Sequence, residues 1–102
     1  PYRRCFMKVF LDDIREAPDG WIRCYWPEDC IELLKTGEVT HISLDHDLGS
    51  DDIGTGYDVL LWIEKAVFTE GFIPPIMAVH SANVSAKVKM EQCIHHIMGV
   101  IF

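Results

Sequence analysis

The chain has 102 residues, a length that suits one domain with a single hydrophobic core. Apolar residues make up 49% of the chain and charged residues 25%, which argues against an intrinsically disordered protein. Nine basic and 16 acidic residues give a net charge of −7, which argues against a protein that coats duplex DNA or binds an anionic membrane. Because no apolar run is long enough to span a bilayer, we expect residues 1–102 to form one cytoplasmic domain.

Four short apolar runs that are rich in β-forming residues predict strands. They lie at residues 5–11, 21–26, 41–44 and 76–79, and a fifth candidate strand lies at residues 100–102. Continuous apolar runs are typical of strands that are buried on both faces of a parallel sheet. Only seven residues, 14–20, join the first two runs, whereas a parallel crossover normally takes about a dozen. The second strand is therefore either antiparallel or reached by an extended link without a helix.

Helices are predicted between these strands. A proline and two acidic residues at 27–29 begin the first helix, and Gly37 follows its end. Residues 57–71 carry apolar side chains at helical spacing, with a terminal glycine. Asn83 is the predicted N-cap of a third helix, which we expect to end at Gly99. Strands that alternate with helices predict an α/β three-layer sandwich with a mostly parallel sheet of four to five strands.

Polar side chains follow three of the predicted strands at their carboxyl ends. They are Asp12 and Asp13 after the first run, Asp45, His46 and Asp47 after the third, and His80 and Ser81 after the fourth. In an open α/β sheet, these strand ends form the crevice where ligands bind. Each acid taken alone is typical of a solvated strand end or a helix cap. Together they predict a functional site.

The acidic residues of this group predict a metal site. Carboxylates that lie close together repel one another unless they share a cation or a proton. We therefore expect Asp12, Asp13, Asp45 and Asp47 to hold a divalent cation, and oxygen ligands favour Mg²⁺ or Mn²⁺. His46 and His80 are candidate proton donors and acceptors beside it. Arg15 is a candidate phosphate clamp.

The cysteines do not predict a metal site. Cys5, Cys24, Cys30 and Cys93 form no Cys-x-x-Cys pair and have no histidine partner at zinc-finger spacing. In a cytoplasmic chain, we expect them to be reduced, buried thiols.

Five motifs in order resemble the receiver-like family of cyclic-phosphate-processing receivers. They are Phe10–Asp13, Ala17–Trp21, Ser43–Gly49, Gly56–Trp62 and Val79–Asn83, and the likeness extends over about residues 8–98. The resemblance implies a receiver-like, flavodoxin-like fold that lacks the first and last receiver helices. It also implies that the chain processes cyclic phosphate ends, on RNA or on nucleotides.

The resemblance also implies roles for individual residues. Asp12, Asp13 and Asp45 would take the metal positions, and Ser81 would supply the hydroxyl that contacts phosphate. His46 and His80 would distinguish this family from signalling receivers. A signalling receiver needs a lysine at the end of its fifth strand, and residues 99–102 contain none, which argues against phosphorelay.

Two functions remain open on the sequence alone. The first is a metal-dependent, phosphodiesterase-like hydrolase in which Asp45, His46, His80 and Ser81 act on the phosphoester. The second is a non-catalytic module that binds a phosphate, a nucleotide or another protein. Without a final helix, an apolar patch near residues 100–102 would also favour a homodimer.

Overall fold

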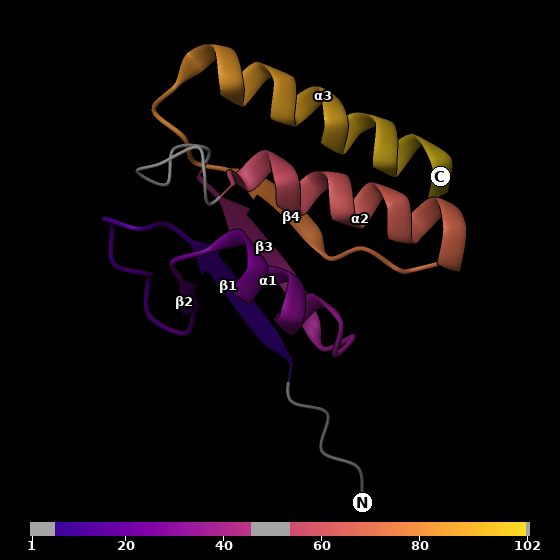
Figure 1. Cartoon of the computed structure of the whole chain (residues 1–102). Coiled ribbons are helices and arrows are strands. Elements are labelled where there is room, and N and C mark those ends of the chain that lie inside the picture. The colour runs from indigo at the N-terminus through magenta and orange to yellow at the C-terminus, as the bar shows by residue number, and fades with distance from the viewer. Residues whose placement is uncertain (1–5, 46–53, 102) are drawn as a thin grey trace, which may run out of the picture.

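The structure is a computed structural model that describes residues 6–45 and 54–101, with side chains up to residue 99 (Figure 1). Its sheet has four parallel strands in the order β2-β1-β3-β4. The strands are β1 (Met7–Leu11), β2 (Ile22–Cys24), β3 (Val39–Leu44) and β4 (Ile76–Val79). The helices are α1 (Pro27–Leu34), α2 (Gly56–Glu70) and α3 (Val84–Ile101). The predicted α/β receiver-like class is confirmed.

The direction of the second strand is settled by its pairing with β1. Val9 pairs with Ile22 and Leu11 with Cys24 in parallel register. The link over residues 12–21 contains no helix, so the chain returns to the start of β2 in an extended path. Because β2 lies on one side of β1 and β3 on the other, the chain reverses direction across the sheet between them. This reversal forms a topological switch point at the carboxyl ends of β1 and β3.

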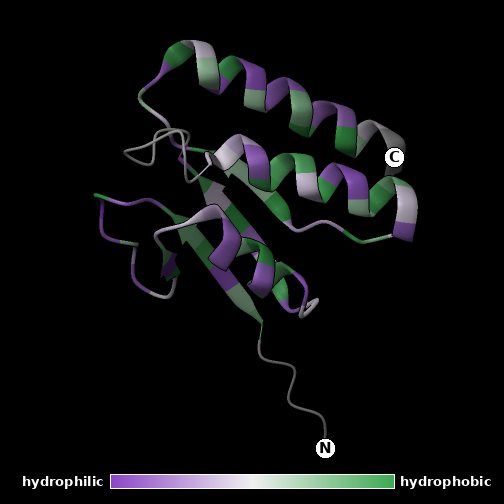
Figure 2. Cartoon of the chain, viewed as in Figure 1, coloured by the Kyte–Doolittle hydropathy of each residue, from purple (hydrophilic) through white to green (hydrophobic). Residues whose placement is uncertain are grey.

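The three helices lie next to one another on one face of the sheet (Figure 1). The crossovers from β2 to β3 and from β3 to β4 run in the same direction, so right-handed connections place α1 and α2 on the same side. Figure 2 shows hydrophobic and hydrophilic residues alternating along α2 and α3, as expected for helices with one buried side. The strands contribute Val9, Leu11, Ile42 and Leu44 to the core beneath the helices.

The predicted end of α2 at Gly71 and the predicted cap of α3 at Asn83 are confirmed. Thr55 and Asp58 form a capping box at the start of α2, and Gly71 ends the helix in the left-handed conformation with φ of 66°. The Asn83 side-chain oxygen accepts a hydrogen bond from the Ala86 amide at 3.1 Å and so caps α3.

The prediction that Gly99 ends the last helix is wrong, because α3 continues to Ile101. Residues 100–101 are therefore helical and do not form a fifth strand. A glycine inside a helix costs only about 1 kcal/mol relative to alanine. Residue 102 and the side chains of the expected self-association patch lie outside the described residues.

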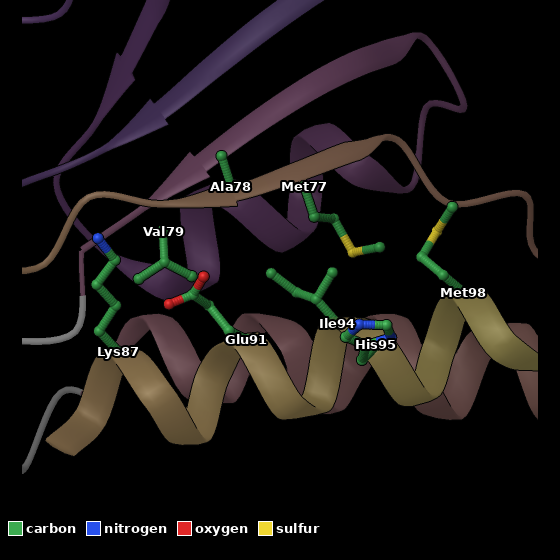
Figure 3. Close-up of a pocket in the computed structure, with 8 residues that line it drawn as sticks. All are labelled: Met77, Ala78, Val79, Lys87, Glu91, Ile94, His95 and Met98. Carbon is green, nitrogen blue, oxygen red and sulfur yellow. The ribbon is translucent and has the colours of Figure 1, made fainter. Parts of the chain in front are cut away.

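The other side of the sheet carries no helix among the described residues, and we call it the open face. Strand alternation and ring contacts place eight residues there: Lys8, Phe10, Trp21, Arg23, His41, Ser43, Ile76 and Ala78. Figure 3 shows the alternation in β4, where Met77 and Val79 point toward α3 and Ala78 points away from it. The helices expected to be missing from a receiver fold thus leave one side of β1, β3 and β4 without a helical layer.

Two further features concern the chain as a whole. None of the helices within the described ranges is both long enough and apolar enough to cross a membrane. Cys24, Cys30 and Cys93 are buried free thiols, as predicted, while Cys5 lies outside the described residues.

Candidate functional site

The site lies where β1, β3 and β4 end side by side. The main-chain ladder continues one residue beyond the strands, because the Asp45 amide donates to the Leu11 carbonyl and the His80 amide to the Leu44 carbonyl, both at 3.0 Å. In the strands themselves, Phe10, Ser43 and Ala78 form one cross-strand row. Two residues further along, the same register brings Asp12, Asp45 and His80 into the next row. Backbone pairing therefore gathers three residues that are far apart in sequence.

The side chains of Asp12, Asp45 and His80 form one compact cluster. Each offers a possible metal ligand atom, and these three atoms all lie within 4.8 Å of one another. Asp12 is fully buried, with 1% of its surface exposed, whereas Asp45 and His80 are partly exposed. A cavity of about 300 Å³ opens beside them and is lined by Asp12, Ile14, Arg15, Asp45 and Ala82. The cluster is thus accessible to a small ligand.

The Asp12 carboxylate is held by its own chain turn and by His80. Its Oδ1 accepts hydrogen bonds from the amides of Ile14 at 2.9 Å and Arg15 at 2.8 Å. Its Oδ2 lies 3.1 Å from His80 Nε2. Burial by itself would raise the pKa of Asp12, but the two amide bonds and the imidazole together outweigh it and lower the pKa. Asp12 is therefore an ionised carboxylate at neutral pH.

His80 is fixed on both ring nitrogens. Since Asp12 is ionised, Nε2 carries the hydrogen in their contact, and Nδ1 lies 2.7 Å from Ser43 Oγ. The imidazole also stacks on Phe10 with 4.2 Å between ring centroids and 4° between planes. Asp12, His80 and Ser43 thus form a continuous hydrogen-bonded chain.

Ser43 and Phe10 were not singled out from the sequence as site residues. A usable signal was the two-residue period of strands, which puts Phe10 on the face of Asp12 and Ser43 on the face of Asp45. That signal needs the strand register, which the sequence does not supply.

Asp13 provides the clearest observation in favour of a cation. Its Oδ1 is buried, and among the described residues it has no hydrogen-bond partner. A buried carboxylate oxygen without a partner is costly unless an ion or water satisfies it. The structure brings Asp12 and Asp45 into one group with His80, and Asp13 is not a member of that group. The two carboxylates are oxygen ligands of the kind that binds Mg²⁺ or Mn²⁺. The residues present therefore fit a divalent cation.

Ser81 and Arg15 border the cluster in different ways. Ser81 is buried, and its hydroxyl oxygen accepts a hydrogen bond from the Asn83 amide at 3.1 Å. The Arg15 guanidinium donates to the His80 carbonyl at 3.2 Å, so it lies at the rim of the cavity. His46 and Asp47, the remaining predicted site residues, lie outside the described residues.

Gly56 determines how closely α2 approaches the site. The glycine is buried, and a Cβ at this position would overlap the backbone carbonyl oxygen of Asp45. The start of α2 therefore packs directly against the end of β3, which only a residue without a side chain permits.

A second cavity, of about 470 Å³, lies between β4 and α3 (Figure 3). Its walls include Met77, Val79, Ile94 and Met98, and no member of the acidic cluster. This larger cavity is also lined by Lys87, Glu91 and His95. We assign the chemistry to the strand-end cavity, because the compact group of possible metal ligands, Asp12, Asp45 and His80, lies there.

Comparison with known proteins agrees with this geometry. A family model described as the cyclic-phosphate processing Receiver domain matches residues 7–96. The search of curated proteins and the search of solved structures each gave no match. The family match extends over nearly the whole chain, and it includes every strand, the acidic cluster and most of α3. The chain therefore belongs to the cyclic-phosphate processing receiver domain family, as its five motifs indicate.

Proposed function

We propose that the protein hydrolyses a cyclic phosphodiester, at an RNA end or on a nucleotide, with the help of Mg²⁺ or Mn²⁺. The observation that carries this proposal is the cluster of Asp12, Asp45 and His80, whose ligand atoms lie within 4.8 Å beside an open cavity. The family description supports the substrate class, since it refers to cyclic-phosphate processing.

Three carboxylates would hold the cation: Asp12, Asp13 and Asp45, with Asp47 as a further candidate. Asp12 is kept ionised by its hydrogen bonds, and Asp13 Oδ1 has no partner within the described part of the chain. When bound, the cation would neutralise charge on the phosphoryl oxygens. Arg15, at the cavity rim, and the Ser81 hydroxyl would hold other phosphoryl oxygens.

Hydrolysis requires that a water molecule gives up a proton and that the departing ester oxygen receives one. The new bond joins the water oxygen to phosphorus, one ring P–O bond breaks, and the product is a phosphomonoester. We propose His80 and His46 as the proton pair. Ser43 Oγ lies 2.7 Å from His80 Nδ1, so its hydroxyl can exchange a proton with His80.

A non-catalytic function is favoured by one observation. Both ring nitrogens of His80 and both oxygens of Asp12 already have partners inside the protein. Side chains whose polar atoms all have partners inside the protein can hold a phosphate-binding or nucleotide-binding site in a fixed geometry without turning over a substrate. This is the alternative against which catalysis must be tested.

The test is product formation from nucleoside 2′,3′-cyclic phosphates, with Mn²⁺ or Mg²⁺ and with a chelator. We expect metal-dependent formation of a phosphomonoester. His80→Gln is expected to reduce turnover by about 10² or more. His95→Gln serves as the matched control, because His95 is exposed on α3 and lies outside the cluster. If no phosphoester gives a metal-dependent product while the protein still binds nucleotide, the binding function replaces the catalytic one.

A further inference from the structure

We propose that the open face of the sheet binds single-stranded RNA, with nucleobases stacked on Trp21 and its neighbours while the strand's terminal phosphate enters the acidic site. The position of the terminal phosphate rests on the proposed function. The binding of bases to the open face does not require turnover.

Aromatic rings form a continuous row across this face, starting from the site. His80 stacks on Phe10, and Phe10 meets Trp21 edge to face with centroids 6.4 Å apart. Trp21 in turn meets His41 at 6.3 Å. Trp21 and His41 are partly exposed, whereas Phe10 is buried beneath its neighbours. Aromatic side chains displayed on a β-sheet are a recurrent way to stack unpaired bases, because every base has a flat π-face.

The charges on this face complement a nucleic acid backbone. The Lys8 ammonium lies 5.9 Å from the centre of a Trp21 ring, and the Arg23 guanidinium lies 4.4 Å from the Tyr25 ring centre. Neither cation has a carboxylate partner among the described residues. None of the eight open-face residues named above is acidic, although Asp12 and Asp45 lie at the end of the same face and the whole chain has a net charge of −7. A local cationic, aromatic surface on an acidic protein favours a polyanion with flat bases.

The composition of the open face argues against a covering helix or a second copy of the chain. On the helical side, β1 and β3 present Val9, Leu11, Ile42 and Leu44, which are almost completely buried. On the open face, the same strands present Lys8, Phe10, His41 and Ser43. A face that a helix covers is expected to be uniformly apolar. The mixture of rings, cations and a hydroxyl instead fits a ligand that is both flat and charged.

The test measures fluorescence anisotropy of a labelled single-stranded RNA of about eight nucleotides, with a 2′,3′-cyclic phosphate or a 3′-hydroxyl end, and of the matching duplex. We expect the single strand to bind more tightly than the duplex. We expect Trp21→Ala to weaken binding by about tenfold or more, and Trp26→Ala, which removes an exposed indole elsewhere, to have little effect. Lys8→Glu is the second variant, since an exposed side chain can change without loss of the fold, and Lys65→Glu is its control.

The outcomes separate this inference from the proposed function. RNA binding that depends on Trp21 and Lys8, in a protein without turnover, supports the inference and refutes catalysis. Turnover of cyclic mononucleotides, with RNA binding unaffected by folded Trp21→Ala and Lys8→Glu, overturns the inference alone. Binding of duplex as tight as that of single strands overturns it as well. The inference is also overturned if the protein is a dimer that binds no RNA and that dissociates on Trp21→Ala, because the open face is then an interface between copies.

Discussion

Replacing Asp12 by asparagine is expected to lower the free energy of unfolding by about 2–3 kcal/mol. The carboxylate accepts three hydrogen bonds, from the Ile14 and Arg15 amides and from His80 Nε2. The side-chain oxygen of asparagine can still accept the two amide hydrogen bonds. Because asparagine is uncharged, each of these bonds has about half the strength of the bond to the carboxylate. Its amide nitrogen would face His80 Nε2, so the imidazole must change to the tautomer that donates from Nδ1 to Ser43 Oγ, and a neutral bond replaces the bond to a charged carboxylate. Bonds to charged groups contribute about 1.5–3 kcal/mol each, and relief of repulsion from Asp45 offsets part of the loss.

The measurement is urea unfolding followed by circular dichroism, at pH 7 with a chelator present. For a chain of this length, the expected loss corresponds to a melting temperature that is lower by roughly 10 °C or more. Asp19→Asn is the matched control, since it removes the same charge from an exposed position on the link between β1 and β2. If Asp12→Asn and Asp19→Asn unfold at the same urea concentration, the hydrogen-bonded carboxylate does not stabilise the fold and our reasoning is wrong.

The environment of Asp12 also predicts how the stability of the folded protein depends on pH. The folded protein lowers the pKa of Asp12, so its stabilisation is fully present above the unfolded carboxyl pKa of about 3.9 and is lost as pH falls through the lower folded pKa. Wild-type stability should therefore decline between about pH 5 and pH 2, and Asp12→Asn should decline less. Parallel pH curves for the two proteins would contradict this assignment.

Four further substitutions test the site and its packing. Gly56→Ala is expected to lower the free energy of unfolding by about 1–3 kcal/mol and to weaken metal binding, because the new Cβ overlaps the Asp45 carbonyl. Gly99 has open space around it inside α3, so Gly99→Ala should raise the free energy of unfolding by up to about 1 kcal/mol. Thermal unfolding measures both changes. Asp45→Asn should abolish Mn²⁺ binding in calorimetry, and equal heats for variant and wild type would place the ion elsewhere. Ser43→Ala should reduce turnover and shift its pH profile by freeing His80 Nδ1, while an unchanged profile would make the Ser43 bond merely structural.

Much of the fold followed from local patterns in the sequence. The apolar runs located β1, β3 and β4, Gly71 marked the end of α2, and Asn83 marked the start of α3. These signals are local because a strand or a helix end depends on a few neighbouring residues. The convergence of the acidic residues was also predictable, since the carboxyl ends of parallel strands meet at one edge whatever the exact register.

The last helix shows where local signals failed. Gly99 is a helix breaker by propensity, yet α3 continues to Ile101. The cost of one glycine is small compared with the packing of a whole helix on α2 and β4, so tertiary contacts carry α3 through Gly99.

Sequence by itself determined the α/β class, the places of the strands and the chemical character of the strand ends. It could do so because the apolar runs and the polar residues that follow them are local patterns, which depend only on neighbouring residues. Tertiary structure alone decided that β2 runs parallel to β1 and that His80 joins Asp12 to Ser43. Each of these depends on strand order and register, which bring together residues from 13 to 68 positions apart. Such long-range pairings are fixed only when the whole sheet assembles, so no local pattern could reveal them.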